Sequence, residues 1–551
     1  MRSPRTSRSI AVLAAGALLL SACGSDNGNG DAAADGDLPP LIIDVNDATS
    51  YQSNFNPFSS TVLAGAQGFI YEPLMINSAM SEGETEPWLA ESMEFNEDGT
   101  AVTFTLREGV EWSDGETFDA EDVAFTFEMM VEHPATNMSA FAVSGAEAID
   151  EHTAEVTFDE TMYAREEALG NTLIVPEHIW SELDDPTEFT NDEPVGTGPF
   201  ELDQFGEQLY VFTAHEGYWN ADAIQVEEVH YPASTSETIT SSLRAGDLDW
   251  AGHYVPNIEE IFVQQDPDHH GFWYPGGGTV TLFVNHEREI FQDRDLREAL
   301  SLAVDRQQLA EVALQDLVEP AHPTGLPLPT YEEYMAAEYE DDAFERDIEA
   351  ANQILDDAGY ETGSDGIRQS PDGEPLSWEI EVPSDYADFI DITQMLEEQF
   401  ADIGVDLTAQ GVSVESYTDA RGSGNFDLTL ASPGAGQTPY DLFQSMMSAE
   451  HLTDDIIVAN YGRYDDQDAE EALAQYRATE DDETRQEALE DLQTVMMEDV
   501  PVIPLLQAGN WFNYNTSRWT GFPDENDPYA FGAPNWIPDI LIVLQNLEPA
   551  E

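Results

Sequence analysis

Side chains suited to covalent or metal chemistry are scarce in this sequence. Cysteine occurs once, at Cys23, and the 11 histidines include one adjacent pair, His269-His270. Adjacent side chains diverge on a strand or helix, so this pair is a poor metal site. His286-Glu287 lacks the second histidine of a zinc-protease helix, and no nucleophile elbow, P-loop or dinucleotide-binding glycine motif is present. We therefore expect no metal and no cofactor. A pair of carboxylates suited to glycoside hydrolysis remains an alternative, because the chain has 112 acidic residues.

The surroundings of Cys23 predict export. Three arginines precede an apolar run from Ile10 to Leu20, and the small residues Ser21 and Ala22 follow it. This is the layout of a secretory signal, and the run is shorter than the roughly 20 residues that span a bilayer. We expect cleavage after Ala22, so that residues 1–22 are a signal peptide. Residues 23–37, rich in Gly and Asp, then form a flexible linker.

The charge balance limits the possible partners. The chain has 112 acidic and 17 basic residues, a net charge of −95, and every basic residue is Arg. Carboxylates at this density repel one another and destabilise the compact state. At molar salt the Debye length falls to about 3 Å, so this repulsion is screened. We interpret the composition as an adaptation to high salt outside the cell, with a surface for cationic partners as the alternative. Nucleic acid is excluded, because the chain has no basic face to meet phosphate.

Hydrophobic spacing predicts an α/β protein. Residues 376–382 alternate as a strand, a helix follows from about Tyr386 to Phe400, and a second strand starts after Gly404. Strand, helix and strand in this order form a βαβ unit with parallel pairing. The pattern also predicts one helix from Asp295 to Leu314, and a capping box of Ser234 with Glu237 at the start of another helix.

Several motifs, in order along the chain, resemble the family 5 extracellular solute-binding proteins of bacterial ABC importers. The most specific is GVEWSDGETFDAEDV at 109–123. Leu20-Ser21-Ala22-Cys23 resembles a lipobox, which implies that Cys23 is acylated. Further matches are at 54–58, 72–74, 87–90, 196–200, 297–300 and 305–306.

The resemblance implies a two-lobe periplasmic-binding-protein-like α/β fold of type II, enlarged by an extra subdomain, with a ligand cleft between the lobes. We place lobe I at 38–285 with the inserted subdomain at about 80–190, lobe II at 286–500, and a return to lobe I at 501–551. The implied function is an extracytoplasmic substrate-binding lipoprotein, not an enzyme. Its implied partners are ABC permease subunits, a small-molecule ligand and the membrane through its lipid anchor, and we expect a monomer.

The ligand is predicted as an oligosaccharide or an oligopeptide. Peptide binders of this family carry a loop acid that pairs with the peptide's amino group, and the segment 432–441 lacks it unless Asp441 serves. The stretches at 249–259 and 273–277 resemble members associated with β-linked oligosaccharides, whose rings stack on aromatic planes. The candidate aromatics are Trp250, Tyr254, Trp273, Tyr274, Tyr440 and Trp511, and the candidate amides are Asn54, Asn56, Asn257 and Asn513. Core packing is the alternative role for each aromatic, and a secreted glycoside hydrolase is the alternative function.

Overall fold

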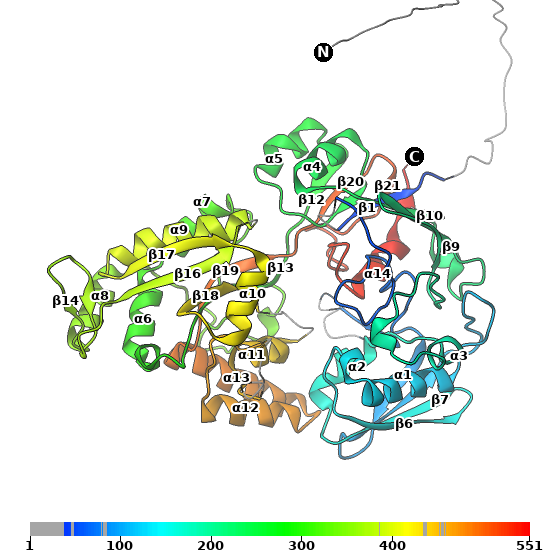
Figure 1. Ribbon diagram of the computed structural model, residues 1–551, viewed down its shortest axis with the longest axis horizontal. Helices are drawn as coiled ribbons and strands as arrows, with labels where there is room; N and C mark the ends of the chain where they lie inside the picture. Colours follow the sequence, from blue (N-terminus) through cyan, green and yellow to red (C-terminus); the bar gives the residue numbers. More distant parts are fainter. Residues whose placement is uncertain are drawn as a thin grey trace, which may run out of the picture. The chain divides into compact units, whose positions relative to one another are not determined.

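Two mixed sheets and an antiparallel insert organise the described chain (Figure 1). The computed structural model describes residues 38–45, 49–78, 80, 85–384, 386–433, 438–450, 452, 457 and 459–550. The predicted signal peptide, linker and lipidation site at Cys23 lie outside the described residues. None of the helices in the described part is long and apolar enough to cross a bilayer.

The first sheet has seven strands, and its centre is parallel. In sheet order these are β12 (His270–Phe272), β20 (Asn513–Asn515), β11 (Trp250–Ala251), β1 (Leu41–Asp44), β10 (Glu228–Pro232), β9 (Leu209–Ala214) and β8 (Phe200–Gly206). Strand β1 pairs in parallel with both β10 and β11, while the outer pairs are antiparallel. The carboxyl ends of β1, β10 and β11 therefore meet at one edge of the sheet.

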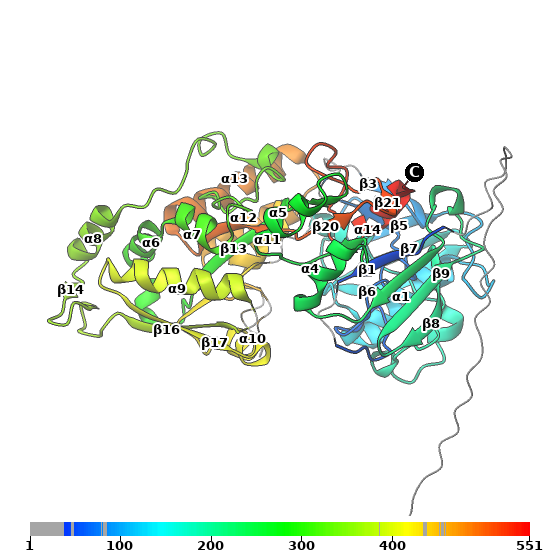
Figure 2. The ribbon, with the colours of Figure 1, turned by 90° about the horizontal axis from the view of Figure 1, so that it is seen from above.

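The second sheet has five strands and contains the predicted βαβ unit. In order they are β17 (Asp406–Val412), β16 (Ser377–Pro383), β18 (Leu428–Ala431), β13 (Gly276–Val284) and β19 (Ile503–Gly509). Strand β16 pairs in parallel with β17 and β18, and helix α9 (Ala387–Ala401) links β16 to β17. Figure 2 shows α9 lying across these strands, and its buried Phe389, Ile392, Leu396 and Phe400 belong to the core of this sheet. The βαβ prediction is confirmed.

The insert is a four-stranded antiparallel sheet in the order β4 (Ala90–Phe95), β5 (Ala101–Leu106), β7 (Thr153–Phe158) and β6 (Val143–Asp150). Helix α1 (Ala120–Glu132) packs against β6 and β7. Asp119 caps this helix, because its carboxylate accepts the Glu121 N–H at 2.9 Å. Three two-stranded ribbons complete the strands: β2 (Met75–Asn77) with β3 (Thr85–Pro87), β14 (Glu361–Thr362) with β15 (Arg368–Gln369), and β21 (Trp519–Thr520) with β22 (Glu548–Pro549).

The remaining helices surround the sheets. They are α2 (Glu166–Gly170), α3 (Glu177–Trp180), α4 (Ser236–Ala245), α5 (Ile258–Ile261), α6 (Arg294–Ala303), α7 (Arg306–Ala313), α8 (Ile348–Asp357), α10 (Val414–Ser423), α11 (Pro439–Met447), α12 (Gln467–Arg477), α13 (Asp482–Asp499) and α14 (Asp539–Asn546).

Two helix predictions were wrong in detail. The single helix expected from Asp295 to Leu314 is two helices, α6 and α7, because Asp305 leaves the helical conformation and caps α7 through the Gln308 N–H. The capping box of α4 is formed by Thr235 and Thr238, one residue later than Ser234 and Glu237. A different cap was available because this stretch holds several hydroxyl side chains in a row, each able to cap a helix.

Two strands next to the expected lobe boundaries pair within the second sheet. Strand β13 lies before position 286 and β19 after position 500, which the sequence assigned to lobe I. Both strands pair inside the second sheet, with each other and, for β13, with β18. Apolarity marks β19 as a buried strand, but it does not identify the sheet, because pairing partners are set by tertiary contacts. The chain passes between the sheets at 273–275 and again at 510–512.

Candidate functional site

The two passages between the sheets run side by side. The Trp273 N–H donates to the Phe512 carbonyl at 3.0 Å, and the Asn510 N–H donates to the Pro275 carbonyl at 2.9 Å. On either side, β12 pairs with β20 and β13 pairs with β19, both antiparallel. A continuous two-stranded ribbon, here called the crossing ribbon, therefore joins the two sheets. Any motion of one sheet against the other has to bend it.

Four of the predicted ligand residues come together on and beside this ribbon. The ring of Trp511 lies 5.0 Å from that of Tyr254 and 4.8 Å from that of Tyr274, the latter edge-on at 89°. The Tyr274 hydroxyl donates to Asn513 Oδ1 at 2.6 Å, and Asn513 Nδ2 donates to the His253 carbonyl at 2.7 Å. We call Tyr254, Tyr274, Trp511 and Asn513 the crossing cluster. These residues lie up to 259 positions apart in the sequence, and strand pairing in the crossing ribbon brings them together.

Exposure divides the crossing cluster into two roles. Tyr274 is 9% exposed and Asn513 is fully buried, whereas Tyr254 and Trp511 are partly exposed. Burial raises the pKa of Tyr254 to about 12, and the negative charges of Asp388 and Asp391 on α9 add to the shift. Tyr254 and Trp511 pack against the core of the second sheet and still keep part of their aromatic surface exposed, while Tyr274 and Asn513 are buried beside them.

A polar group occupies the carboxyl edge of the parallel strands of the first sheet. Asp44 ends β1, Ser234 follows β10 and His253 follows β11. The Ser234 hydroxyl donates to Asp44 Oδ2, and His253 Nε2 lies 3.4 Å from Asp44 Oδ1. In open α/β sheets this edge is the usual position of a ligand. Because the serine contacts the aspartate and not the histidine, the three residues are not arranged as a catalytic triad.

Sequence reasoning missed Asp44, Ser234 and His253. The sequence does place each of these residues at or just after the end of an apolar strand. That position identifies a site only once the three strands are known to be parallel neighbours.

Asn54, Asn56 and Tyr440 lie in other parts of the fold. Asn54 donates to the hydroxyls of its own loop, Ser59 and Thr61. Asn56, 1% exposed, donates to two backbone carbonyls of the insert's last turn, at 186 and 189. Tyr440 is fully buried in the core beneath α11, where its ring stacks on Tyr476 at 4.7 Å. The structure gives these three residues packing and loop-fixing contacts.

Trp250, Trp273 and Asn257 border the crossing ribbon without joining the cluster. Trp250 is fully buried, and its indole N–H donates to the Gly532 carbonyl at 2.6 Å. Trp273 is a partly exposed residue of the ribbon itself. Asn257 takes a left-handed conformation (φ 54°) at the start of α5, and its N–H donates to Gln315 Oε1 at 2.6 Å.

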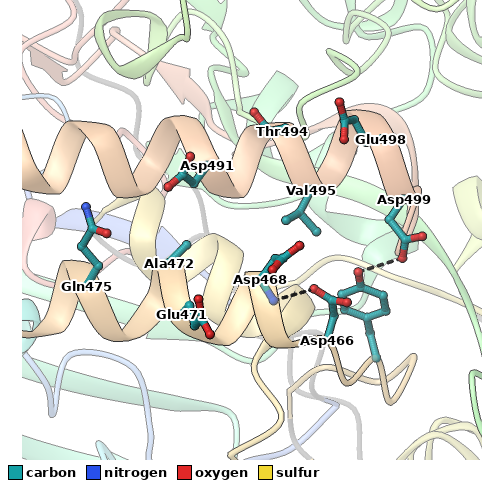
Figure 3. Close-up of a pocket in the computed structure, with 11 residues that line it drawn as sticks. Asp466, Asp468, Glu471, Ala472, Gln475, Asp491, Thr494, Val495, Glu498 and Asp499 are labelled. Atoms are coloured by element: carbon teal, nitrogen blue, oxygen red, sulfur yellow. Dashed lines mark hydrogen bonds between the residues drawn. The ribbon is translucent and has the colours of Figure 1, made fainter.

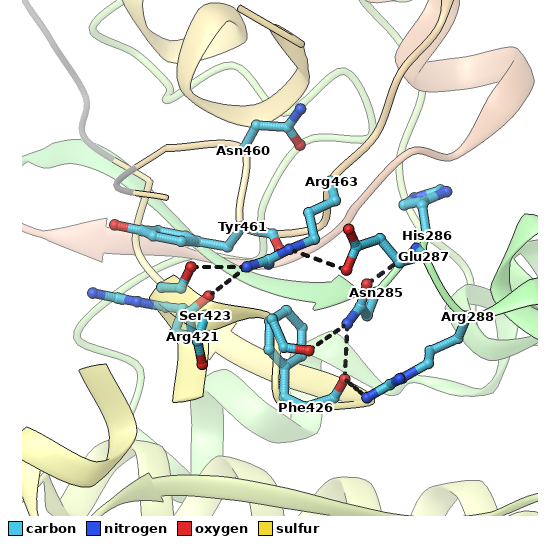
Figure 4. Close-up of polar contacts among 12 residues, drawn as sticks. Asn285, His286, Glu287, Arg288, Arg421, Ser423, Phe426, Asn460, Tyr461 and Arg463 are labelled. Atoms are coloured by element: carbon cyan, nitrogen blue, oxygen red, sulfur yellow. Dashed lines mark hydrogen bonds and ion pairs between the residues drawn. The ribbon is translucent and has the colours of Figure 1, made fainter. Parts of the chain in front are cut away.

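The few basic side chains are largely engaged with the backbone. Arg463, 6% exposed, donates to the carbonyls of Tyr461 at 2.6 Å and Gly422 at 2.9 Å and lies 3.5 Å from Glu287 (Figure 4). Arg306, 3% exposed, donates to two carbonyls, and burial lowers its pKa to about 9. Guanidinium groups used in this way stabilise loops and helix ends, and they are not available to a ligand.

A pocket of about 520 Å³ lies between α12 and α13, away from the crossing cluster. Carboxylates from both helices line it (Figure 3). They are Asp466, Asp468, Glu471, Asp491, Glu498 and Asp499. None of the predicted ligand residues lines this pocket, and no group of three or more possible metal ligands was found among the described residues. We interpret the pocket as part of the acidic surface.

Comparison with known proteins identifies the class of protein. The model of the bacterial extracellular solute-binding proteins, family 5 Middle, matches residues 84–453. Protein XP55 of Streptomyces lividans is 30% identical over 463 residues, which cover 80% of this chain and 79% of that protein. The oligopeptide ABC transporter, periplasmic oligopeptide-binding protein, of Thermotoga maritima superposes with a TM-score of 0.85 at 27% identity over 93% of this chain and 99% of its own.

A second structure of the Thermotoga maritima protein, with mannohexaose bound, superposes with a TM-score of 0.80 at 27% identity over the same shares of the two chains. These matches confirm the predicted two-lobe α/β fold. The proteins of this family bind solutes and are not enzymes, so the glycoside hydrolase alternative is set aside. The chain belongs to family 5 of the bacterial extracellular solute-binding proteins.

Proposed function

We propose that this protein is the substrate-binding lipoprotein of an ABC importer and that it captures an oligosaccharide between its two lobes. The observation that carries the ligand class is the crossing cluster, where Tyr254 and Trp511 offer aromatic surface beside a fixed amide. Sugar rings present apolar C–H faces to such planes, and their hydroxyls hydrogen-bond to amides and carboxylates. The related Thermotoga maritima protein with bound mannohexaose supports the same class.

The proposed mechanism is hinge closure. We place the lobe boundaries at the crossing ribbon, residues 273–275 and 510–512, because sheet membership changes there. A ligand that touches both lobes favours the closed state by the difference between its affinities for the two states. Tyr254 has neighbours on both sheets. It follows His253, whose Nε2 lies 3.4 Å from Asp44 Oδ1 on the first sheet. Burial raises the pKa of Tyr254, and the negative charges of Asp388 and Asp391 on α9 add to the shift. The closed form is then the one that the permease recognises.

An oligopeptide is the second candidate, because the related Thermotoga maritima protein is named as oligopeptide-binding. A peptide brings an ammonium group, which is costly to bury without an acidic partner. Asp441, the possible acid of segment 432–441, closes the capping box of α11, where its Oδ2 accepts the Thr438 hydroxyl at 3.1 Å. Residues 434–437 lie outside the described part. This engagement of Asp441 favours the sugar.

Calorimetric titration separates the candidates. We would titrate the mature protein in molar NaCl with cellobiose, xylobiose, mannohexaose and tetra-alanine. Saturable binding of a sugar without release of monosaccharide is the expected result. Tight binding of tetra-alanine together with no response to any sugar would overturn the ligand class. As a control, Trp378→Phe alters a tryptophan in the core of the second sheet and is expected to leave the affinity unchanged.

We further propose that Cys23 carries the lipid anchor and that the mature protein is held at the extracytoplasmic face of the cell membrane. The lipobox-like Leu20-Ser21-Ala22-Cys23 supports this proposal. Stable anchoring requires more than one inserted chain, which a fully acylated cysteine supplies. A tethered monomer stays close to its permease.

A further inference from the structure

Two buried amide side chains on and beside the crossing ribbon have ends without a hydrogen-bond partner. Gln507 is 5% exposed and Asn510 is 8% exposed. Both atoms are buried: among the described residues, Gln507 Oε1 accepts no hydrogen bond and Asn510 Nδ2 donates none. Leaving a buried polar group unsatisfied costs about 1–3 kcal/mol, and most such groups in native proteins have a partner. Two of them within four residues therefore need an explanation.

Neighbouring amides on the same stretch of chain do not share this property. Asn513 uses both ends of its amide, with Tyr274 and the His253 carbonyl. Asn515, 2% exposed, donates to the Leu243 carbonyl at 2.9 Å and accepts the Ser517 N–H at 3.0 Å. The fold thus satisfies the amides of β20 and leaves one end of Gln507 on β19 and one end of Asn510 in the passage without a partner.

Two glycines of the opposite strand, Gly276 and Gly277, lie beside the two amides, and the Leu328 carbonyl lies 3.1 Å from the Cβ position of Gly276. A Cβ atom at Gly276 would lie 3.5 Å from Gln507 Oε1, and one at Gly277 would lie 3.8 Å from Asn510 Nδ2. Gly277 is partly exposed, so solvent reaches this side of the ribbon. The position of a Cβ at Gly277 is also 3.9 Å from the ring of Phe531, which packs at 5.0 Å on Trp536. Trp536 Nε1 is a third buried polar atom without a partner in this part of the fold.

We infer that Gln507 and Asn510 form a hydrogen-bonding subsite for the hydroxyl groups of an uncharged ligand. A hydroxyl both donates and accepts, so one hydroxyl of such a ligand can donate to Gln507 Oε1 and another can accept from Asn510 Nδ2. This deepens the proposed function and rests on it, since it assigns a sugar's hydroxyls to named groups. The subsite lies on the ribbon that bends during closure, so a ligand held there is in contact with the moving part.

The test compares ligand affinity with the stability of the free protein. Gln507→Met and Asn510→Leu keep side-chain volume but remove the unsatisfied group. Replacing such a group by an apolar one is close to neutral for folding, so the melting temperature of the free protein is expected to stay or rise. Each variant is expected to bind mannohexaose about 2- to 12-fold more weakly, the loss of one neutral hydrogen bond. The matched control is Asn515→Leu, which should lower the melting temperature and leave the affinity unchanged.

The outcomes separate this inference from the proposed function. If the wild-type protein binds mannohexaose and both variants bind it with unchanged affinity, the subsite assignment is wrong, because neither amide then contacts the ligand. If the wild-type protein binds tetra-alanine and none of the sugars, the proposed ligand class fails and the hydroxyl assignment fails with it. A lower melting temperature in both variants without ligand would show that the groups have partners in the fold, which also overturns the inference.

Discussion

Replacing Glu72 by glutamine is expected to remove the contribution of this buried carboxyl to the pH dependence of folding stability. Glu72 is fully buried. Trp88 Nε1 donates to its Oε1 at 2.6 Å, the Tyr218 hydroxyl donates to the same atom at 2.8 Å, and Trp219 Nε1 donates to Oε2 at 3.2 Å. Burial raises the pKa of this carboxyl from 4.5 to about 7, although the hydrogen bonds act in the opposite direction. The carboxyl of Glu72 therefore titrates in a pH range in which unfolding can be measured.

The sign follows from proton linkage. The folded protein holds the Glu72 proton more tightly than the unfolded chain, so this group favours folding most below its unfolded pKa of 4.5, and the contribution is lost as the pH rises towards 7. At about 1.4 kcal/mol per pKa unit, the loss between about pH 5 and about pH 8 is about 2 to 3 kcal/mol. Burial also raises the pKa of Glu167 to about 7 and the pKa values of Asp122 and Asp539 to about 6, so only a comparison with a variant isolates Glu72.

The assay is urea unfolding of the wild-type protein and Glu72→Gln at about pH 5 and about pH 8, in the same molar salt. The wild-type free energy of unfolding, relative to that of the variant, is expected to fall by about 2 to 3 kcal/mol from the lower to the higher pH. The exposed Glu128→Gln on α1 is the matched control and should show no such change. An equal wild-type-to-variant difference at both pH values would refute the reasoning.

Three further predictions concern the anchor, the ligand surface and the charge. Cys23→Ser is expected to move the protein from the membrane fraction to the medium, as followed by immunoblotting and by incorporation of labelled palmitate; retention in the membrane would exclude a lipid anchor. Trp511→Ala removes the ring that contacts both Tyr254 and Tyr274 and should weaken mannohexaose binding at least about tenfold, as for other aromatic anchors, while Trp378→Phe does not. The melting temperature should rise from low to molar NaCl, because salt screens the net charge of −95; an unchanged value would contradict screening.

Local elements were predictable because their signals are local. The alternation at 376–382 gave strand β16, and the helix expected from about Tyr386 to Phe400 is α9. Asp119 caps α1 as its sequence indicates. Each of these features depends on residues within one or two turns of each other, so a reader of the sequence has all the information needed.

The site was only partly predictable because its residues are joined by pairing between distant segments. Tyr254, Tyr274, Trp511 and Asn513 were selected by residue type, and the ribbon does bring them together. The same criterion selected Tyr440, which the structure places in a core. An aromatic residue serves a core and a binding surface equally well, so type alone cannot separate the two roles.

The sequence by itself determined the family, the class of fold and the predicted route out of the cell, since all three depend on composition and on short ordered motifs. The tertiary structure decided where the chain changes sheets, which put β13 and β19 in the second sheet. It also decided which amides are satisfied, leaving Gln507 and Asn510 unsatisfied while Asn513 and Asn515 are bonded. Hydrogen-bond satisfaction depends on partners far away in the sequence, so no pattern along the chain can reveal it.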